Sequence, residues 1–249
     1  MKKLIVFTVF YLCCTSSVNA QERCQYEAAE IDEVNGKGVL KSTGQTINGV
    51  VCSYYDNLGV NMEMPFKDGK REGISRHYNE NGKLWKEANY KDNTLEGIER
   101  KYYENGRLEG ECSYKSGKLE GILRWYHENG NLWRETPYID NKQEGISRHY
   151  YENGNLWWET PYKDGNVEGI EKWYYESGRL QEEFSFKNGK REGYRQIYME
   201  NGQLLMKLLY RNDSPVSGAC GDGRKFTAAE IKNWSDNRHA VSCTPQEAL

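Results

Sequence analysis

Histidine and cysteine are the residues of this chain that could bind a metal or act in catalysis. Two of the four histidines, His77 and His149, occupy the same position of a repeating pattern, three units apart. With two strands per unit and about 4.8 Å between strands, they would lie roughly 29 Å apart, too far to share a metal ion. The sequence also lacks a glycine-rich phosphate loop, a nucleophile elbow and paired Cys-x-x-Cys motifs. We therefore expect no metal, cofactor or catalytic site, and no enzyme activity.

Carboxylates are plentiful, but many of them return at fixed positions. The glutamates of the Glu-Gly and Glu-Asn-Gly sequences recur once per unit, as at Glu96 and Glu104. A residue that occurs at the same position in every unit of an array is typical of contacts that stabilise the array. We interpret these glutamates as structural rather than catalytic.

These positions belong to a 24-residue repeat, whose clearest copy is Gly97–Glu120. The glycine of Glu-Gly recurs at this interval from Gly73 to Gly193, and a turn glycine recurs from Gly82 to Gly202. A period of this size indicates an array of stacked units. Three further columns are almost invariant: Tyr78, Tyr102, Tyr126, Tyr150, Tyr174 and Tyr198; Leu84, Leu108, Leu132, Leu156, Leu180 and Leu204; and Tyr90, Tyr114, Tyr138, Tyr162, Phe186 and Tyr210.

Each unit is typical of two short antiparallel strands. An Ile-x-Arg-x-Tyr strand precedes a Glu-Asn-Gly turn, a second strand follows, and a Lys-x-Gly-Lys turn leads to the next unit. The fold class we predict is all-β, an elongated antiparallel array of β-hairpin repeats with a short C-terminal α-helical cap. Seven units would span 49–216, with the first and last degenerate. An N-terminal cap or degenerate half-repeat would span 21–48.

Two hairpin registers are open, and they place different side chains on each face. A two-residue Asn-Gly loop pairs Arg100 with Glu111 and its equivalents in other units. A three-residue Glu-Asn-Gly loop with a glycine bulge pairs Tyr102 with Leu108, and would place the fixed Ile, Tyr, Leu and second Tyr columns on one face. Burial of those side chains, at roughly 1.5–3 kcal/mol each, outweighs exposed ion pairs at about 0.2–1 kcal/mol, so we favour the second register.

The N-terminus has the pattern of a secretory signal peptide over 1–20. Lys2 and Lys3 precede an apolar run, and Val18-Asn19-Ala20 supplies small residues for cleavage before Gln21. The run is too short to span a bilayer, so we expect no stable membrane span after cleavage. The predicted location is exported: periplasmic, cell-surface or secreted.

Five of the seven cysteines remain once the predicted signal peptide is removed. In an exported chain, cysteines near both ends are typical of disulfide-stapled caps, and we predict the pairs Cys24–Cys52 and Cys220–Cys243. Cys112 is left over, as a buried thiol without a reactive role. Thr227-Ala228-Ala229-Glu230 is a capping box and predicts a helix within a stapled cap over 217–249, folded over the last hairpin and shielding the open sheet edge.

Tryptophan and histidine recur at two variable positions of the repeat, in place of Lys, Glu, Gln, Leu or Ile in other units. In the favoured register both columns lie on the face of the sheet that does not carry the fixed columns. Exposed aromatic ladders suit protein interfaces or stacking on sugars, whereas the alternative is that they pack on neighbours or a second layer. The candidate partner-binding residues are Trp85, Trp125, Trp133, Trp157, Trp173, His77 and His149.

The unit, with Tyr-Tyr-Glu-Asn-Gly-Arg-Leu at 102–108 and Tyr-Lys-Ser-Gly-Lys-Leu-Glu-Gly at 114–121, resembles the MORN-variant repeat of the YwqK antitoxin family over residues 49–216. The resemblance implies an elongated antiparallel sheet and protein binding, with no catalytic residues. An export signal and stapling cysteines depart from an antitoxin that acts on a cytoplasmic toxin.

Charge narrows the choice of partner. The 34 basic and 37 acidic side chains give a net charge of −3, which offers no electrostatic basis for nucleic-acid binding. We predict an exported scaffold that binds a protein, in the manner of an antitoxin or immunity protein that neutralises a toxin or effector. The alternative is a cell-envelope glycan-binding module that stacks sugars on its aromatic ladders.

Overall fold

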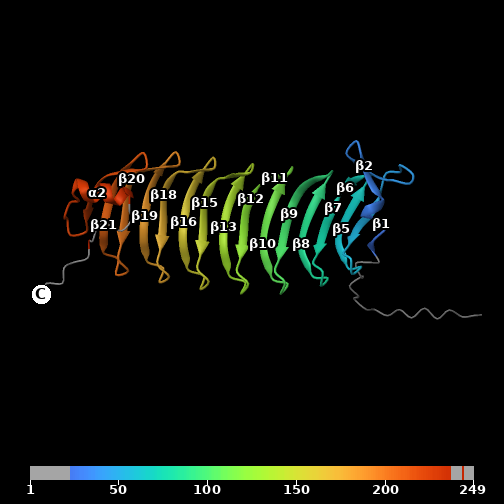
Figure 1. Ribbon diagram of the computed structural model, residues 1–249, viewed down its shortest axis with the longest axis horizontal. Helices are drawn as coiled ribbons and strands as arrows, with labels where there is room; N and C mark the ends of the chain where they lie inside the picture. Colours follow the sequence, from blue (N-terminus) through green and yellow to red (C-terminus); the bar gives the residue numbers. More distant parts are fainter. Residues whose placement is uncertain (1–22, 237–242, 244–249) are drawn as a thin grey trace, which may run out of the picture.

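A computed structural model describes residues 23–236 and Cys243. These residues form one long, almost entirely antiparallel sheet in a single layer, with a separate two-stranded sheet near the N-terminus and a short helix at the C-terminal end (Figure 1). The predicted all-β repeat fold is confirmed. Within the described residues no helix is long and apolar enough to cross a membrane.

The elements follow the repeat. The N-terminal part holds β1 (Tyr26–Glu27), the 3₁₀ turn η1 (Ala28–Glu30), β2 (Ile31–Val34) and β3 (Lys37–Leu40). The array then consists of β4 (Gly49–Tyr54), β5 (Val60–Lys67), β6 (Lys70–Arg71), β7 (Gly73–Tyr78), β8 (Leu84–Lys91), β9 (Thr94–Tyr102), β10 (Leu108–Lys115), β11 (Lys118–Leu119), β12 (Gly121–Tyr126), β13 (Leu132–Ile139), β14 (Lys142–Gln143), β15 (Gly145–Tyr150), β16 (Leu156–Lys163), β17 (Asn166–Val167), β18 (Gly169–Tyr174), β19 (Leu180–Lys187), β20 (Lys190–Tyr198), β21 (Leu204–Arg211) and β22 (Ser214–Cys220). The helix α2 (Ala228–Asp236) follows.

Two kinds of turn join the strands, as the repeat predicts. In the first, the N–H of Tyr103 donates to the carbonyl of Arg107 at 2.9 Å, enclosing the three-residue loop Glu104-Asn105-Gly106. Gly106 has φ of 83° there, a value that glycine adopts without strain. The second turn has two residues with positive φ, for example Asp92 and Asn93 at 49° and 70°.

A β-bulge reconciles the two registers considered from the sequence. Tyr102 pairs with Leu108, as the three-residue loop requires, but the register then shifts at residue 109. Beyond the shift Arg100 pairs with Glu111, the pairing expected for the two-residue loop. The same shift follows the closing pair in the other units. The extra residue reverses which face each later side chain occupies.

The expectation that all four fixed columns share one buried face is therefore wrong. The Ile, first Tyr and Leu columns lie on one face, together with the Arg and Glu columns. The second Tyr column, as at Tyr90, lies on the other face because it comes after the bulge. The Ile column is also exposed, from 39% at Ile122 to 49% at Ile170, since no second layer covers this face.

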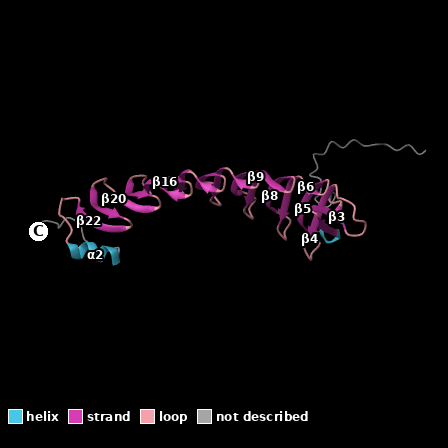
Figure 2. Cartoon of the chain, turned by 90° about the horizontal axis from the view of Figure 1, so that it is seen from above, coloured by secondary structure: helices cyan, strands magenta, loops and turns pink. Residues whose placement is uncertain are grey.

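We call the two faces convex and concave. The sheet is bowed, and α2 lies on its concave side (Figure 2). Trp234 of α2 packs against Met206, Leu208 and Tyr210, which places these sheet residues and their equivalents on the concave face. The convex face carries the Ile74, Arg76, Tyr78, Leu84 and Glu87 columns.

A continuous polar ladder runs along the convex face. Glu135 illustrates it: its carboxylate lies 3.9 Å from Arg124 and 3.4 Å from Arg148, and it accepts a 3.0 Å hydrogen bond from Tyr150. Equivalent Tyr-to-Glu hydrogen bonds recur from Tyr78 to Tyr198. Burial first, and then Glu135, raises the pKa of Tyr150 to about 12, so the phenol stays protonated and keeps donating. The ladder thus ties each unit to its neighbours.

The glutamates of the Glu-Gly sequences are structural, as expected, whereas those of the Glu-Asn-Gly loops, such as Glu104, are exposed. The side chain of Glu96 accepts a 2.7 Å hydrogen bond from the backbone N–H of Ser116, and five other units repeat this contact. These bonds lock one turn onto the turn of the next unit.

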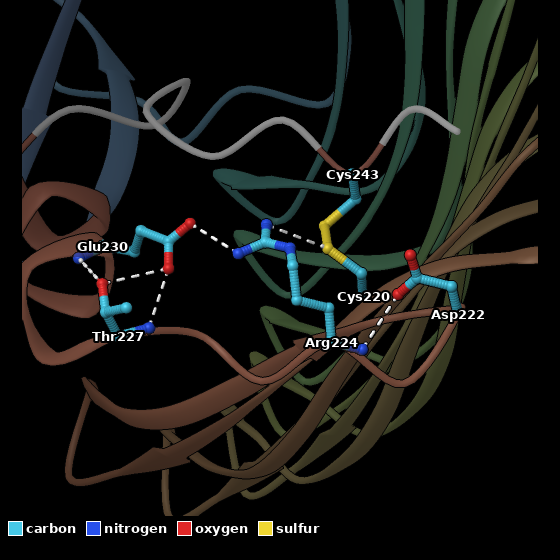
Figure 3. Close-up of a disulfide and its surroundings, with 6 residues drawn as sticks. All are labelled: Cys220, Asp222, Arg224, Thr227, Glu230 and Cys243. Atoms are coloured by element: carbon cyan, nitrogen blue, oxygen red, sulfur yellow. Dashed lines mark hydrogen bonds and ion pairs between the residues drawn. A yellow bond between two sulfur atoms is a disulfide. The ribbon is translucent and has the colours of Figure 1, made fainter. Parts of the chain in front are cut away.

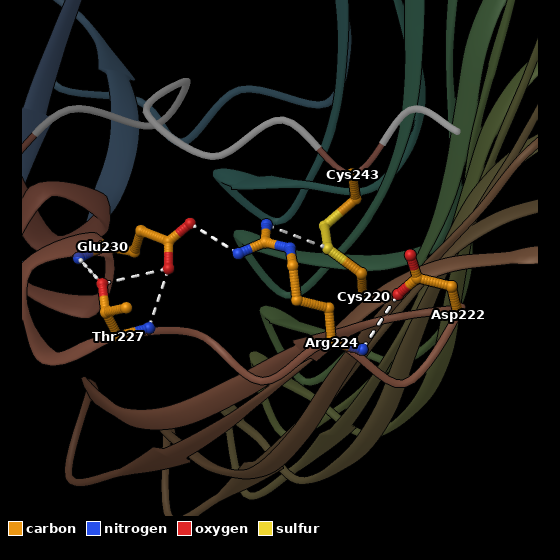
Figure 4. A network of polar contacts seen from close by, with 6 residues as sticks. All are labelled: Cys220, Asp222, Arg224, Thr227, Glu230 and Cys243. Carbon is orange, nitrogen blue, oxygen red and sulfur yellow. Dashed lines mark hydrogen bonds and ion pairs between the residues drawn. A yellow bond between two sulfur atoms is a disulfide. The ribbon is translucent and has the colours of Figure 1, made fainter. Parts of the chain in front are cut away.

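The C-terminal cap is held by a disulfide between Cys220 and Cys243, as predicted (Figure 3). Both bonds of the capping box are present, because Thr227 accepts from the N–H of Glu230 at 3.2 Å and Glu230 accepts from the N–H of Thr227 at 2.7 Å. Arg224 joins the two features, donating to Glu230 at 2.9 Å and to the sulfur of Cys220 at 3.3 Å (Figure 4).

The helix does not shield the sheet edge in the expected way. It lies on the concave face, where the Trp234 indole N–H donates to the Tyr210 hydroxyl at 3.1 Å. The edge of β22 is instead covered in part by the extended segment 224–226, since the N–H of Phe226 donates to Gly218 at 2.9 Å and that of Cys220 to Arg224 at 2.8 Å. An extended segment satisfies edge N–H and C=O groups directly, which a helix cannot do.

The N-terminal cap is built differently. The predicted disulfide between Cys24 and Cys52 is present, and β1 pairs in parallel with β4. The β2–β3 hairpin is anchored at the turn edge, where the N–H of Gly38 donates to the carbonyl of Gly69 at 2.7 Å. The predicted signal peptide over 1–20 and the fourth histidine, His239, lie outside the described residues.

Candidate functional site

The structure brings together four of the seven aromatic residues singled out from the sequence. Trp133, His149, Trp157 and Trp173 lie on the concave face of neighbouring strands β13, β15, β16 and β18. Trp158 joins them and completes the set, which we call the aromatic cluster. No layer covers this part of the sheet, because the caps lie at its two ends (Figure 2).

Stacking runs across three strands of the aromatic cluster. The rings of His149 and Trp158 are 3.7 Å apart and nearly parallel at 14°, and those of Trp158 and Trp173 are 4.9 Å apart at 17°. Both faces of the Trp158 ring are therefore occupied by protein. Trp157 meets Trp158 edge-on at 4.3 Å, and Tyr151 stacks on Trp157 at 5.4 Å. Such pairs each contribute about 0.5–1.5 kcal/mol beyond burial.

Small polar side chains form the floor beside the rings. The hydroxyls of Thr136 and Ser147 are 2.8 Å apart, and both residues are buried. Thr160 and the Trp173 indole N–H each donate to Glu171 at 2.8 Å. These bonds satisfy the buried polar groups and fix the orientation of Trp173.

His149 is the titratable residue at the centre of the cluster. It is 8% exposed, and its Nδ1 atom has no hydrogen-bond partner within the described residues. Burial, and then the positive charge of Arg134, lower its pKa to about 4. The imidazole is therefore neutral at pH 7 and stacks as an uncharged ring.

The remaining three predicted residues lie elsewhere on the concave face. Trp85 and His77 contact each other with ring centres 5.7 Å apart, toward the N-terminal cap. Trp125 lies over Gly110, and the amine of Lys101 is 5.4 Å from its ring. The structure thus divides the predicted ladder into one cluster and two separate groups.

Trp158 is the residue that sequence reasoning missed. Its column holds Lys86, Gly110, Arg134 and Glu182 in other units, so it shows no aromatic pattern. The two-residue-loop register contained the information, since pairing Arg148 with Glu159 places Trp158 opposite His149, as observed. The three-residue-loop register, which the sequence favoured on burial, does not place Trp158 opposite His149.

Other chemistry is sparse on this face. Within residues 23–236 and at Cys243, no group of three His, Cys, Asp or Glu side chains is arranged to hold a metal ion. Cys112 is free and buried, and burial raises the pKa of its thiol. A raised pKa leaves the thiol protonated, which is the unreactive form.

Comparison with known proteins identifies the repeat. A family model described as a MORN repeat variant matches six segments: 71–92, 95–116, 119–140, 143–164, 167–188 and 191–212. No curated protein matches the chain.

Solved structures are only distantly similar. A mutant of S. aureus TarM in complex with fondaparinux, alpha-GlcNAc-glycerol and UDP is 14% identical with a TM-score of 0.28, over 39% of this chain and 19% of that one. The pneumococcal O-GlcNAc transferase GtfA with UDP and GlcNAc is 15% identical with a TM-score of 0.20, over 49% and 22%. A TcdB2-TccC3-Cdc42 structure is 10% identical with a TM-score of 0.18, over 76% and 13%. The chain thus spans about a fifth or less of these chains, and the likeness carries no functional argument.

Proposed function

The chain belongs to the family of MORN repeat variants, and from this premise we propose that it is an exported scaffold that binds a protein partner through the aromatic cluster. The observation that carries the proposal is a cluster of five aromatic rings on a part of the concave face that no second layer covers (Figure 2). Tryptophan is among the residues that contribute most to protein interfaces. Trp133, 41% exposed, offers a ring that a partner could bury.

The proposed location rests on the two disulfides. Disulfides persist in oxidising compartments, and both caps of this array carry one. Together with the signal-like residues 1–20, they favour export to the periplasm, the cell surface or the medium. Resemblance to YwqK antitoxins suggests the form of binding, in which the partner is a toxin or effector that the scaffold neutralises without catalysis.

Glycan binding is the alternative, and the ring geometry favours it less. Sugars stack on open ring faces, yet His149 and Trp173 occupy both faces of Trp158. Trp157 is covered on one side by Tyr151. Trp158 therefore offers a sugar no open ring face and Trp157 at most one, which favours a protein partner.

Matched variants on the two faces test the proposal. We would immobilise the disulfide-bonded chain, capture partners from envelope and secreted fractions, and compare Trp133→Ala/Trp157→Ala with Ile122→Ala/Ile146→Ala. We expect one stoichiometric protein that the convex-face variant retains and the concave-face variant loses. Equal capture by both folded variants would refute the cluster as the binding site. Retention on polysaccharide instead of protein would favour the glycan module.

A further inference from the structure

We propose that the aromatic cluster binds an extended, proline-rich segment that carries basic side chains. This inference rests on the proposed function and specifies the chemistry of the partner. The segment would cross the strands along the array, with prolines against the tryptophans and its arginine or lysine side chains at the neighbouring loop edge. Three observations support it: the charge of that edge, the spacing of the units and the free donors of the cluster.

The loop edge beside the cluster is acidic. Each three-residue loop, Glu-Asn-Gly or Glu-Ser-Gly, presents one exposed glutamate, and beside the cluster these are Glu128, Glu152 and Glu176. None of the three carboxylates forms an ion pair within the described part of the chain, and that of Glu176 accepts a 3.2 Å hydrogen bond from the amide of Asn153. In some units a cation follows the loop glycine, at Arg107 and Arg179. Each donates to a backbone carbonyl of the next loop, Arg107 to Glu128 and Arg179 to Glu200, both at 2.8 Å.

The units beside the cluster have asparagine at that position. Asn131 and Asn155 make the same carbonyl contacts through neutral amides, at 2.7 and 2.8 Å. A neutral amide thus replaces the cation at the carbonyls of Glu152 and Glu176, whereas Arg107 contacts that of Glu128. On the concave face of β13, β15, β16 and β18, Arg134 is the one basic side chain, and it donates to Thr136 at 3.0 Å. The uncompensated charge of the edge is negative, which favours a cationic partner.

A hollow at this edge is suited to a cation. It has a volume of about 520 Å³ and is lined by Tyr103, His127, Glu128, Asn129 and Glu152. The His127 ring lies 6.3 Å from that of Trp133, so the hollow adjoins the cluster. A guanidinium or ammonium group there would meet two carboxylates and an aromatic face, the arrangement of a cation–π site.

The repeat spacing matches a polyproline II helix. Two strands per unit advance about 9.6 Å along the array. A polyproline II helix has three residues per turn and rises about 3.1 Å per residue, or roughly 9.3 Å per turn. One turn of such a segment therefore spans one unit, so that equivalent side chains meet equivalent positions at Trp133 and Trp157. Aromatic grooves recognise this conformation because it is already extended and loses little entropy on binding.

The cluster also has donors for such a segment. Prolines remove backbone donors, so a proline-rich segment mainly offers carbonyl acceptors. The indole N–H groups of Trp133 and Trp157 make no hydrogen bond in the described structure, and both residues remain partly accessible. They can donate to these carbonyls while their rings contact the prolines.

Calorimetric titration of the full, disulfide-bonded chain tests the inference with synthetic peptides of about twelve residues. The probe is four Arg-Pro-Pro triplets. The controls are four Glu-Pro-Pro triplets, which reverse the charge, and four Arg-Gly-Ser triplets, which keep the charge but not the conformation. A soluble chito-oligosaccharide is the glycan control. We expect measurable binding of the Arg-Pro-Pro peptide only.

Protein variants locate the binding. We expect Trp157→Ala to weaken it about tenfold and Glu152→Gln about three- to fivefold. Glu200→Gln, at the equivalent loop position away from the cluster, should leave it unchanged. Equal binding of the Arg-Gly-Ser or Glu-Pro-Pro peptide, binding of the oligosaccharide alone, or an equal effect of Glu200→Gln would each overturn the inference. If no peptide binds while Trp133→Ala/Trp157→Ala still abolishes capture of a protein partner, the inference fails and the proposed function stands.

Discussion

The two faces of this sheet are built from the same strands but follow different rules. The convex face repeats one set of side chains in almost every unit, and these form the Glu–Arg–Tyr ladder. The concave face changes from unit to unit, from Lys86 and Glu99 as an ion pair to the stacked rings of His149 and Trp158. The comparison separates two tasks, since the repeated face holds the units together and the variable face is free to specialise.

The separation also explains why the buried residues are not the repeated ones. Most buried side chains lie in the concave floor, where small residues such as Ser75 and Thr136 are covered by larger neighbours. The repeated isoleucines remain exposed. Repetition in this array therefore marks contacts between units more than it marks a hydrophobic core.

The largest effect should come from removing the ring at the centre of the cluster. Trp158→Ala deletes a side chain stacked on both faces, and we expect a loss of about 2–4 kcal/mol in the free energy of unfolding. Trp133→Ala, at an exposed ring, is the matched control and should lose less than about 1 kcal/mol. Urea unfolding followed by circular dichroism measures both. If both variants lost the same stability, the division of the cluster into a structural centre and an accessible rim would be wrong.

Next in size is a break in the convex ladder. Glu135→Ala leaves Tyr150, Arg124 and Arg148 without their shared acceptor, and we expect a cost of about 1.5–3 kcal/mol. Glu128→Ala removes an exposed loop carboxylate of the same unit and should change stability by less than about 0.5 kcal/mol. The same urea titration applies. Peptide or partner binding should survive in Glu135→Ala, since the ladder lies on the opposite face; loss of binding in a folded variant would contradict the separation of tasks.

The sequence was sufficient for the architecture and for part of the site. The period, both turn types and the capping box at Thr227 could be read directly, because each depends on local residue types. The two disulfides are predicted from the placement of cysteines near each end of an exported chain. The assignment of side chains to the two faces could not be read from the sequence. One bulged residue after each closing pair reverses the face of every later side chain, and residue 109 and its equivalents have no residue type that marks a bulge. The burial energy that favoured the three-residue-loop register counts only if a second layer covers the fixed columns. The sheet has a single layer, and its isoleucines are exposed.

Lowering the pH should destabilise the folded chain through His149, which lies on the concave face. Its pKa is about 4 when folded and 6.5 in its ordinary state, so the unfolded chain binds this proton first as the pH falls. The neutral ring thus contributes fully above pH 6.5, and its contribution is lost as the pH falls from 6.5 toward 4. Between pH 6.5 and 4 we expect the free energy of unfolding of the wild-type chain to fall by about 1–3 kcal/mol more than that of His149→Phe, whose side chain binds no proton. Parallel curves for the two proteins between pH 7 and 4 would argue against a buried neutral imidazole.

The smallest expected effect lies in the exposed isoleucine column of the convex face. Ile122→Thr keeps a β-branched side chain on the strand. The site is 39% exposed in the folded chain, so part of the apolar area of this isoleucine never leaves water on folding. We expect a change in the free energy of unfolding below about 0.5 kcal/mol and unaltered peptide binding. Ile146→Thr and the double variant should behave alike, with additive effects, because the two residues lie on different hairpins. A cost above about 1.5 kcal/mol for the single variant would mean that this column is covered in solution. The convex face would then be an interface as well as a scaffold, and sedimentation of the wild-type chain beside the double variant would show whether a second copy covers it.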